Sequence, residues 1–390
     1  MKKGIRVLSA LLSVICVFVF SGIYYISSEV PDTVYTTSPD VVINNDCINC
    51  ITSNNNENSK YYELKLLNIF PVKNIELISA KSNQVALSGE QFGVKLYSSG
   101  SVITSVSSVL TSEGCSNPAY DAGLRKGDVI ISINGHDICS NSDVESIVSN
   151  SESKLSIVYE RNGKRYSTIA YSVKSISDGK NRLGIWIKDS IAGVGTSTFY
   201  NPANGITAGL GHGIYENETD VLMPLNEGII CDVELCGISE SKEGCIGEIS
   251  ARLSDENNEY VIENCDCGIY SSGREKTGRL IDVANVTEIE TGYAQLYLSI
   301  DGNPPELYDC EIKSVDYKSE YKNLIVEITD DELLQKTGGI VQGMSGTPII
   351  QNGKLVAALT HVFVNDCKKG YAVFAMTMLV ETEQLSEKLN

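Results

Sequence analysis

A glycine-rich turn around Ser345 holds the residues of this sequence that are best suited to nucleophilic chemistry. The turn reads Gly343-Met344-Ser345-Gly346, with strand-like apolar residues before and after it. A serine hydroxyl is a poor nucleophile by itself, and it needs a general base and amide donors around the developing oxyanion. The amides of Gly343 and Ser345 can supply those donors. The base must come from elsewhere in the chain.

Histidine is the side chain best suited to act as a base near neutral pH, and the sequence holds 3 of them. His212 lies between two glycines, which allow close approach of the backbone and keep the ring accessible. His361 follows Thr360 in a strand-like run, where a structural histidine is an equally good interpretation. His136 follows a predicted surface turn and is not expected to take part in catalysis.

The residues alone do not select the carboxylate that would orient the histidine. Asp330 and Asp331 lie shortly before the serine. Thr329 and Glu332 have the spacing of a capping box, so the start of a helix is a sufficient explanation for both aspartates. Other candidates on chemical grounds are Asp232, Asp255 and Asp282.

Length and composition limit the possible functions. The chain has 390 residues, enough for two or three domains at roughly 100–200 residues each. Its 50 acidic and 31 basic residues give a formal net charge of -19, which repels phosphate backbones and argues against nucleic-acid binding. The 12 cysteines and the scattered histidines match no standard zinc spacing, so we expect no metal and no cofactor.

The N-terminal part has the pattern of a membrane anchor followed by a tether. Lys2, Lys3 and Arg6 precede an uncharged apolar run at residues 7–26, which as a helix spans the roughly 30 Å hydrocarbon core. We expect residues 1–27 to form a single-pass anchor with its basic flank in the cytoplasm, with a cleaved signal peptide as the alternative. Either way, the bulk is extracytoplasmic. Residues 28–60 are asparagine-rich, so a flexible tether is expected there.

The cysteines do not determine a disulfide framework. Export would permit disulfide bonds, but Cys16 lies in the apolar run and leaves an odd number outside it. No pairing can be deduced, and free buried thiols are as good an interpretation. The nearest pairs are Cys47 with Cys50, Cys231 with Cys236, and Cys265 with Cys267.

After a connecting segment at residues 61–84, residues 85–175 resemble a PDZ domain. The resemblance rests on Ala122-Gly123-Leu124 and Gly127-Asp128-Val129-Ile130, followed by a type I′ turn signal at Asn134-Gly135. It implies a groove in which an extended peptide adds as a strand. A PDZ fold that serves only as a spacer is the alternative. The expected groove strand consists of Phe92, Gly93, Val94, Lys95 and Leu96.

Residues 180–390 are rich in short valine, isoleucine and threonine runs broken by glycine and asparagine, which predicts strands. The string from Gly343 to Pro348 resembles the Gly-Asp-Ser-Gly-Gly-Pro loop of chymotrypsin-like peptidases, and a histidine before the serine fits their order. An α/β-hydrolase elbow fits less well, because Thr347 stands where that motif needs glycine. We therefore expect a mainly β chain whose last domain is a chymotrypsin-like double β-barrel.

Taken together, residues 61–390 resemble the stage IV sporulation protein B peptidase family of endospore-forming bacteria. The resemblance is carried by Leu210-Gly211-His212-Gly213-Ile214, by Gly339-Ile340-Val341-Gln342-Gly343-Met344-Ser345-Gly346 and by Thr360-His361-Val362-Phe363. It implies a serine endopeptidase with His212 as base, Ser345 as nucleophile and Asp330 as orienting acid, although the wider chymotrypsin-like pattern has its acid far upstream. The fold it implies places Thr360 and His361 on a strand that lines the substrate cleft.

The same resemblance implies partners and a location. The enzyme would be made in the forespore and act between the two forespore membranes. It would cleave itself, within residues 28–60 by our expectation, because only a flexible stretch can enter the cleft. It would then cleave a membrane-bound regulator that holds an intramembrane metalloprotease inactive, which starts late sigma-factor activation in the mother cell.

Two other functions remain open at this point. A membrane-tethered PDZ adaptor with an inert peptidase domain would need neither His212 nor Ser345, and both are present. A quality-control peptidase of the high-temperature-requirement type carries its PDZ domain after the peptidase domain, whereas here the PDZ segment comes first.

Overall fold

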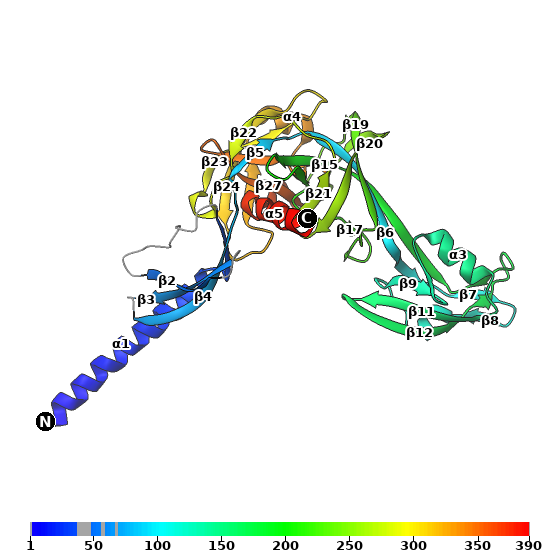
Figure 1. The fold of residues 1–390 in the computed structure, drawn as a ribbon, viewed down its shortest axis with the longest axis horizontal. Coiled ribbons are helices and arrows are strands. Elements are labelled where there is room, and N and C mark those ends of the chain that lie inside the picture. The colour runs from blue at the N-terminus through cyan, green and yellow to red at the C-terminus, as the bar shows by residue number, and fades with distance from the viewer. Residues whose placement is uncertain (1, 37–47, 56–58, 67–68, 390) are drawn as a thin grey trace.

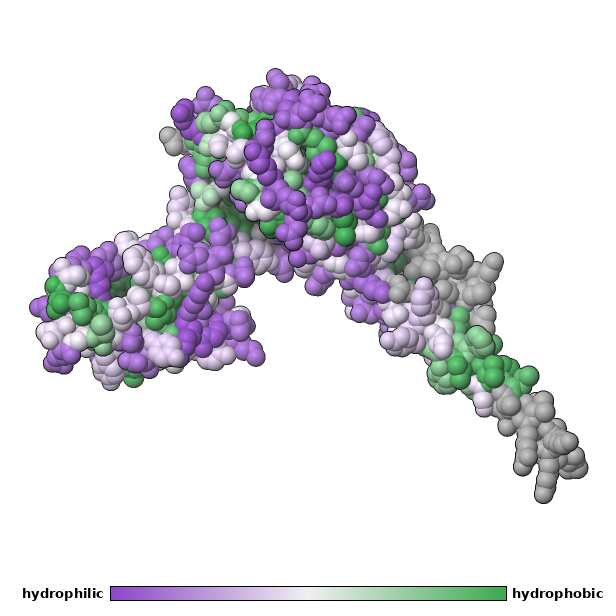
Figure 2. Space-filling view, turned by 180° about the vertical axis from the view of Figure 1, so that it is seen from behind, coloured by the Kyte–Doolittle hydropathy of each residue, from purple (hydrophilic) through white to green (hydrophobic). Residues whose placement is uncertain are grey.

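The structure is a computed structural model, and it describes residues 2–36, 48–55, 59–66 and 69–389. Figure 1 shows an N-terminal arm, a central body that contains the C-terminus, and a third part that long strands connect to the body. The surface of the central body is largely hydrophilic (Figure 2), as the acidic composition leads one to expect.

The arm consists of one helix and a small sheet. Among the residues whose side chains are described, no helix has the length and apolar character needed to span a membrane. The strands of the sheet lie in the order β1-β4-β3-β2. The elements are α1 (Lys2–Glu29), β1 (Thr33–Thr36), β2 (Ile48–Asn55), β3 (Ser59–Leu66) and β4 (Phe70–Ser79).

The sheet corrects the expectation of a tether throughout residues 28–60. Strand β1 pairs in parallel with β4, and the carbonyl of Thr36 accepts a hydrogen bond from the N–H of Ala80 at 2.8 Å. Tyr35 packs against the core of the central body. Composition could not predict that residues 33–36 form a strand, because the partners of β1 lie in segments distant in sequence. Residues 37–47 and 56–58 of the predicted tether lie outside the described residues.

Six strands of the central body close into a first barrel. Following the pairings from β6 leads through β19, β20, β21, β16 and β15 and back to β6. Phe92, Leu210 and Val261 are among the buried side chains inside it. The strands are β6 (Gln91–Val106), β15 (Ile185–Asn201), β16 (Ile206–Gly209), β19 (Glu227–Ile238), β20 (Ile249–Cys265) and β21 (Gly268–Ser272).

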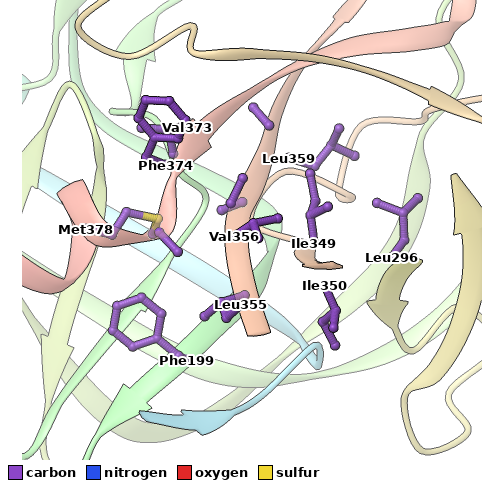
Figure 3. Packing of buried hydrophobic residues seen from close by; sticks show 14 of the residues in the cluster. Phe199, Leu296, Ile349, Ile350, Leu355, Val356, Leu359, Val373, Phe374 and Met378 are labelled. Atoms are coloured by element: carbon purple, nitrogen blue, oxygen red, sulfur yellow. The ribbon is translucent and has the colours of Figure 1, made fainter. Parts of the chain in front are cut away.

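A second closed barrel follows in the chain, with the strand order β23-β24-β25-β28-β27-β26. Its apolar side chains and those of the final helix form one continuous core with Phe199 of the first barrel, and Figure 3 shows Phe199, Leu355 and Met378 in it. The elements are β23 (Gly292–Leu298), β24 (Glu306–Val315), β25 (Leu324–Ile328), α4 (Asp331–Thr337), β26 (Pro348–Gln351), β27 (Lys354–Phe363), β28 (Asp366–Phe374) and α5 (Ala375–Leu389).

Short elements connect the two barrels and complete the body. Strands β5 and β22 extend the first sheet beyond β15. These elements are β5 (Gln84–Leu87), β17 (Tyr215–Glu216), β18 (Val221–Leu222), β22 (Leu280–Asp282) and the 3₁₀ helix η1 (Val286–Glu288).

The third part of the molecule is a small domain with its own core, which includes Leu124, Ile130 and Leu155. Its sheet is continuous with that of the first barrel, because β6 and β15 run through both. Its elements are β7 (Val109–Thr111), β8 (Gly114–Ser116), α2 (Pro118–Asp121), β9 (Val129–Ile133), β10 (His136–Asp137), α3 (Asn141–Ser149), β11 (Lys154–Arg161), β12 (Lys164–Tyr171), β13 (Val173–Lys174) and β14 (Asn181–Arg182).

The expected groove strand, Phe92 to Leu96, is not an open edge, and this corrects the sequence-based assignment. Val94 pairs with Gly193 of β15 on one side and with Ile230 of β19 on the other. A strand with a neighbour on both sides has no free amides and carbonyls to offer an added peptide strand. These residues therefore belong to the first barrel.

Candidate active site

The Ser345 turn lies between α4 and β26 and is held by a strand of the other barrel. The N–H of Thr196 in β15 donates to the carbonyl of Ser345 at 2.8 Å, and the Thr196 hydroxyl donates to the carbonyl of Gly343 at 2.8 Å. A Cβ placed on Gly346 would lie 1.9 Å from the Thr196 carbonyl oxygen, so only glycine fits this close approach. The serine is thus presented at the junction of the two barrels.

Two backbone donors beside the serine are free. Within the described part of the chain, neither the N–H of Gly343 nor that of Ser345 has an acceptor. Gly343 is buried, and a buried amide without a partner is rare in proteins. The arrangement fits the two oxyanion donors expected from the sequence.

The serine hydroxyl is hydrogen-bonded to a backbone carbonyl oxygen. Ser345 Oγ donates to the carbonyl of Thr360 in β27 at 2.7 Å, and no hydrogen bond joins it to His212. Catalytic hydrogen bonds are often unformed in free enzymes and tighten when substrate binds. In this structure the Ser345 hydroxyl is therefore held by the backbone of β27.

His212 follows β16 through a sharp turn. Leu210 and Gly211 both have positive φ angles, of 63° and 69°, and a Cβ on Gly211 would lie 2.9 Å from the Thr360 side chain. This close packing of the turn on β27 places the His212 ring 4.5 Å, centroid to centroid, from the ring of His361. Both residues of the expected cleft strand, Thr360 and His361, thus lie beside the residues expected to be catalytic.

The protonation state of His212 suits a base. Its Nδ1 lies 2.8 Å from the carbonyl oxygen of Gly213, and since that oxygen can only accept, Nδ1 carries the proton and Nε2 has the free lone pair. Desolvation by burial lowers the pKa of His212 below its ordinary value, which keeps the ring neutral. Desolvation, together with the neighbouring His212 and Lys322, lowers the pKa of His361 to about 4.

A cavity of about 440 Å³ opens beside the two histidines. Tyr215 and Asp266 lie on its wall, and the Tyr215 hydroxyl donates to the Asp266 carboxylate. Burial and this hydrogen bond raise the pKa of Tyr215. Sequence reasoning missed both residues, because they come from separate segments of the chain and no motif contains them. Gly213 was also missed as the partner of His212, although it is the next residue in the chain.

Asp330 lies apart from the histidines in this structure. Its carboxylate accepts from the N–H of Leu333 at 2.9 Å and from the N–H of Asp309 at 3.2 Å, so it is the N-cap of α4. Lys322 lines the cavity and precedes β25, whereas Asp330 follows that strand. The strand, which is roughly 17 Å long at about 3.4 Å per residue, therefore separates Asp330 from the cavity. The helix start expected here exists, but Asp330 rather than Thr329 caps it.

The small domain has an open groove at a different strand from the one expected. Residues 185–188 at the start of β15 pair with β6 on one side only, and the other side faces α3. A cavity of about 660 Å³ lies there, lined by Val144 and Val148 of α3 and by Ile185 and Trp186. This is an edge to which an extended peptide could add as a strand.

Two family profiles match this chain. The profile described as SpoIVB peptidase S55 matches residues 179–379, and a PDZ domain profile matches residues 117–161. A search of curated proteins found no match.

Solved structures of a bacterial protease are also similar in part. The active form of the Rv3671c protease from M. tuberculosis is 13% identical, with a TM-score of 0.31, over 50% of this chain and 74% of that chain. An inactive form carrying a serine-to-alanine mutation is 12% identical, with a TM-score of 0.30, over 51% of this chain and 84% of that chain.

The family profile that spans residues 179–379 covers more than half of the 390 residues and includes both His212 and Ser345. The chain therefore belongs to the SpoIVB peptidase S55 family and is a serine peptidase with a PDZ domain.

Proposed function

We propose that this serine peptidase is a sporulation endopeptidase in which Ser345 is the nucleophile and His212 the base. The observation that carries the assignment is the pair of free amides at Gly343 and Ser345, next to a serine that lies across the barrel junction from a neutral histidine. A largely buried turn that keeps two donors unpaired is suited to receive an oxyanion.

In the proposed reaction, Ser345 leaves the Thr360 carbonyl and turns to Nε2 of His212. The histidine takes the hydroxyl proton as Oγ attacks the peptide carbonyl, and the two free amides bind the oxyanion. His212 then gives the proton to the departing amine, which leaves an acyl-enzyme. Water, deprotonated by His212, hydrolyses the ester and restores Ser345.

Two different residues position the base and the nucleophile in this proposal. The Gly213 carbonyl holds Nδ1–H directly and sets the tautomer that catalysis needs. Asp330, the acid that the resemblance implies, acts as a positioning residue, because it caps the helix that leads into the Ser345 turn. Direct contact between Asp330 and His212 would require a rearrangement of α4.

The substrates we propose are proteins with extended segments. The enzyme would cleave itself and a membrane-bound regulator of an intramembrane metalloprotease, and so signal from forespore to mother cell. The groove between α3 and residues 185–188 would bind a peptide segment of such a partner. Self-cleavage within residues 28–60 would have to avoid or unpair strands β1 and β2, which are hydrogen-bonded in the arm.

The proposed function also implies where in the cell the enzyme lies. The N-terminal helix α1 would anchor the chain in the forespore membrane, with the PDZ domain and both barrels in the intermembrane space. Cleavage after the anchor would release them. Alkylation of single cysteines by a membrane-impermeant reagent would measure this topology.

The experiment for the catalytic assignment compares the full chain with Ser345→Ala in detergent. We expect the native chain to cleave itself, to cleave the regulator when the two are mixed, and to bind a fluorophosphonate at Ser345. The variant should lose all three properties while keeping its circular dichroism spectrum. A native chain that never reacts with the probe would instead support an inert, peptide-binding adaptor.

A further inference from the structure

Two thiols lie next to each other at the β20–β21 turn, close to the candidate active site. Cys265 ends β20, Cys267 is in the two-residue turn, and their Sγ atoms are 3.4 Å apart. Both are free thiols in this structure. Protein disulfides have an S–S length of about 2.05 Å, so the sulfurs would have to approach by more than an ångström.

We propose that Cys265 and Cys267 are a modification site: a small organic disulfide oxidises them to an intramolecular disulfide, and this slows the peptidase by shifting the turn that supports His212. The second half of this inference rests on the proposed function, whereas the first half does not. A disulfide that spans a single residue is strained, and strained disulfides are the readily reduced ones. The modification would therefore be reversible.

The two cysteines differ in access, which determines the order of the steps. Cys265 is partly exposed, whereas Cys267 is 4% exposed and its Sγ lies 3.2 Å from the Tyr270 hydroxyl. The hydrogen bond with Cys265 and burial raise the pKa of Cys267 well above its ordinary value. Cys265 is therefore the thiol that meets an external reagent.

The chemistry balances without any further oxidant. The Cys265 thiolate attacks one sulfur of the small disulfide, the S–S bond breaks, and a small thiolate leaves and takes up a proton. The Cys267 sulfur then attacks Cys265 Sγ and breaks the mixed disulfide, and its proton goes to the second departing thiolate. Two protein thiols are oxidised to one disulfide, and one small disulfide is reduced to two thiols.

The turn is in direct contact with the segment that holds His212. A Cβ placed on Gly213 would lie 2.8 Å from the Cys265 carbonyl oxygen, so the two backbones pack without a gap. Gly213 is the residue whose carbonyl fixes Nδ1 of His212. Moving Cys265 therefore moves the oxygen that orients the base.

The residues on either side of Cys265 strengthen this connection. Buried Asn264 accepts from the N–H of Ile214 at 2.8 Å and donates to its carbonyl at 3.1 Å. Asp266, between the two cysteines, accepts the hydroxyl of Tyr215 on the wall of the cavity. A misplacement of about 1 Å in a catalytic group can cost a factor of about 100 in rate, so a shift of this turn should be visible in activity.

The test treats the full chain with oxidised glutathione and then blocks the remaining thiols with iodoacetamide. Trypsin cuts after Arg252 and Arg274, and the peptide 253–274 between them contains only these two cysteines. We expect this peptide to lose two hydrogens and to carry no alkyl group, whereas the untreated chain gives the doubly alkylated peptide. Peptide cleavage should fall at least tenfold and recover with dithiothreitol.

The controls separate the two halves of the inference. Cys265→Ser should abolish the response to glutathione disulfide, whereas Cys236→Ser, at an exposed thiol distant in sequence from the turn, should keep it. A doubly alkylated peptide after full oxidation overturns the proposal, and so does a complete disulfide with unchanged activity. If neither state cleaves any peptide, the proposed function fails, while the peptide mass still decides whether the disulfide forms.

Discussion

Thr196 in the first barrel and Ser345 in the second are joined through their backbones, with the Thr196 N–H donating to the Ser345 carbonyl at 2.8 Å. The Thr196 hydroxyl extends the connection to the carbonyl of Gly343, one of the two residues with a free amide. His212 comes from the same barrel as Thr196. The strand that holds the Ser345 turn therefore also sets its position relative to His212.

Replacing Thr196 with valine should weaken this connection. The variant loses the hydroxyl donor and leaves the buried Gly343 carbonyl without it, which should cost about 1–2 kcal/mol of unfolding free energy. We expect kcat to fall about tenfold, because the oxyanion donors lose their fixed position. The measurements are urea unfolding and steady-state cleavage of a peptide.

Thr207→Val is the matched control for Thr196→Val. The Thr207 hydroxyl is buried and has no hydrogen-bond partner among the described residues, so its loss should leave both quantities near the native values. Equal losses of stability and kcat in the two variants would contradict the proposed role of the Thr196 hydroxyl in fixing the Ser345 turn.

Two substitutions of Asp330 should separate its capping role from a role as acid. Asparagine caps helices about as well as aspartate, so Asp330→Asn should keep the cap from the Leu333 N–H and most of the activity, and lose only the longer bond from the Asp309 N–H. Asp330→Ala loses the cap, and we expect it to lose about 1 kcal/mol of stability and several-fold in kcat.

The measurement for Asp330 combines thermal unfolding with kcat on one peptide. A loss of about 10⁴ in kcat for Asp330→Asn with normal stability would assign it the classical role of the triad acid instead. In that outcome, α4 must rearrange when the substrate binds.

The rate should depend on pH through His212. Desolvation lowers its pKa below 6.5, so the neutral base persists below that pH and kcat/KM should fall only as the solution becomes more acidic. Acid should also destabilise the fold. His212 of the unfolded chain binds a proton from about pH 6.5 downward, whereas His212 of the folded chain stays neutral to a lower pH, so the free energy of unfolding falls as the pH falls.

A pH–rate profile with stability measured in parallel checks this prediction. His136→Gln, at an exposed position in the PDZ domain, should leave the profile unchanged. An acidic limb with its midpoint above pH 6.5 would contradict the assignment of a desolvated base.

Peptide binding in the groove of the PDZ domain should depend on Trp186. Its side chain is 67% exposed at the open edge of β15, so Trp186→Ala should weaken binding of an extended peptide about tenfold without loss of folding. Tyr171→Ala, 59% exposed on β12, is the matched control and should bind normally. Fluorescence titration with a labelled peptide measures both, and fluorophosphonate labelling of Ser345 should be the same in each.

Local sequence determined the chemistry of the site. The Gly343–Gly346 turn and His212 between two glycines are recognisable because the functions proposed for them depend on neighbouring residues, and the structure places both at the barrel junction. The PDZ domain was likewise recognisable from short strings, and a PDZ profile matches residues 117–161. A helix start near Asp330 was predictable for the same reason, since capping involves residues three positions apart.

Tertiary structure decided which groups meet. Whether Phe92–Leu96 or the start of β15 offers an open edge depends on strands from distant parts of the chain, and such pairings leave no local pattern. The Tyr215–Asp266 contact, the pairing of β1 with β4 and the bond from the Asp309 N–H to Asp330 have the same origin. Residue types define what a group can do, but only the closing of the barrels brings it to its partner.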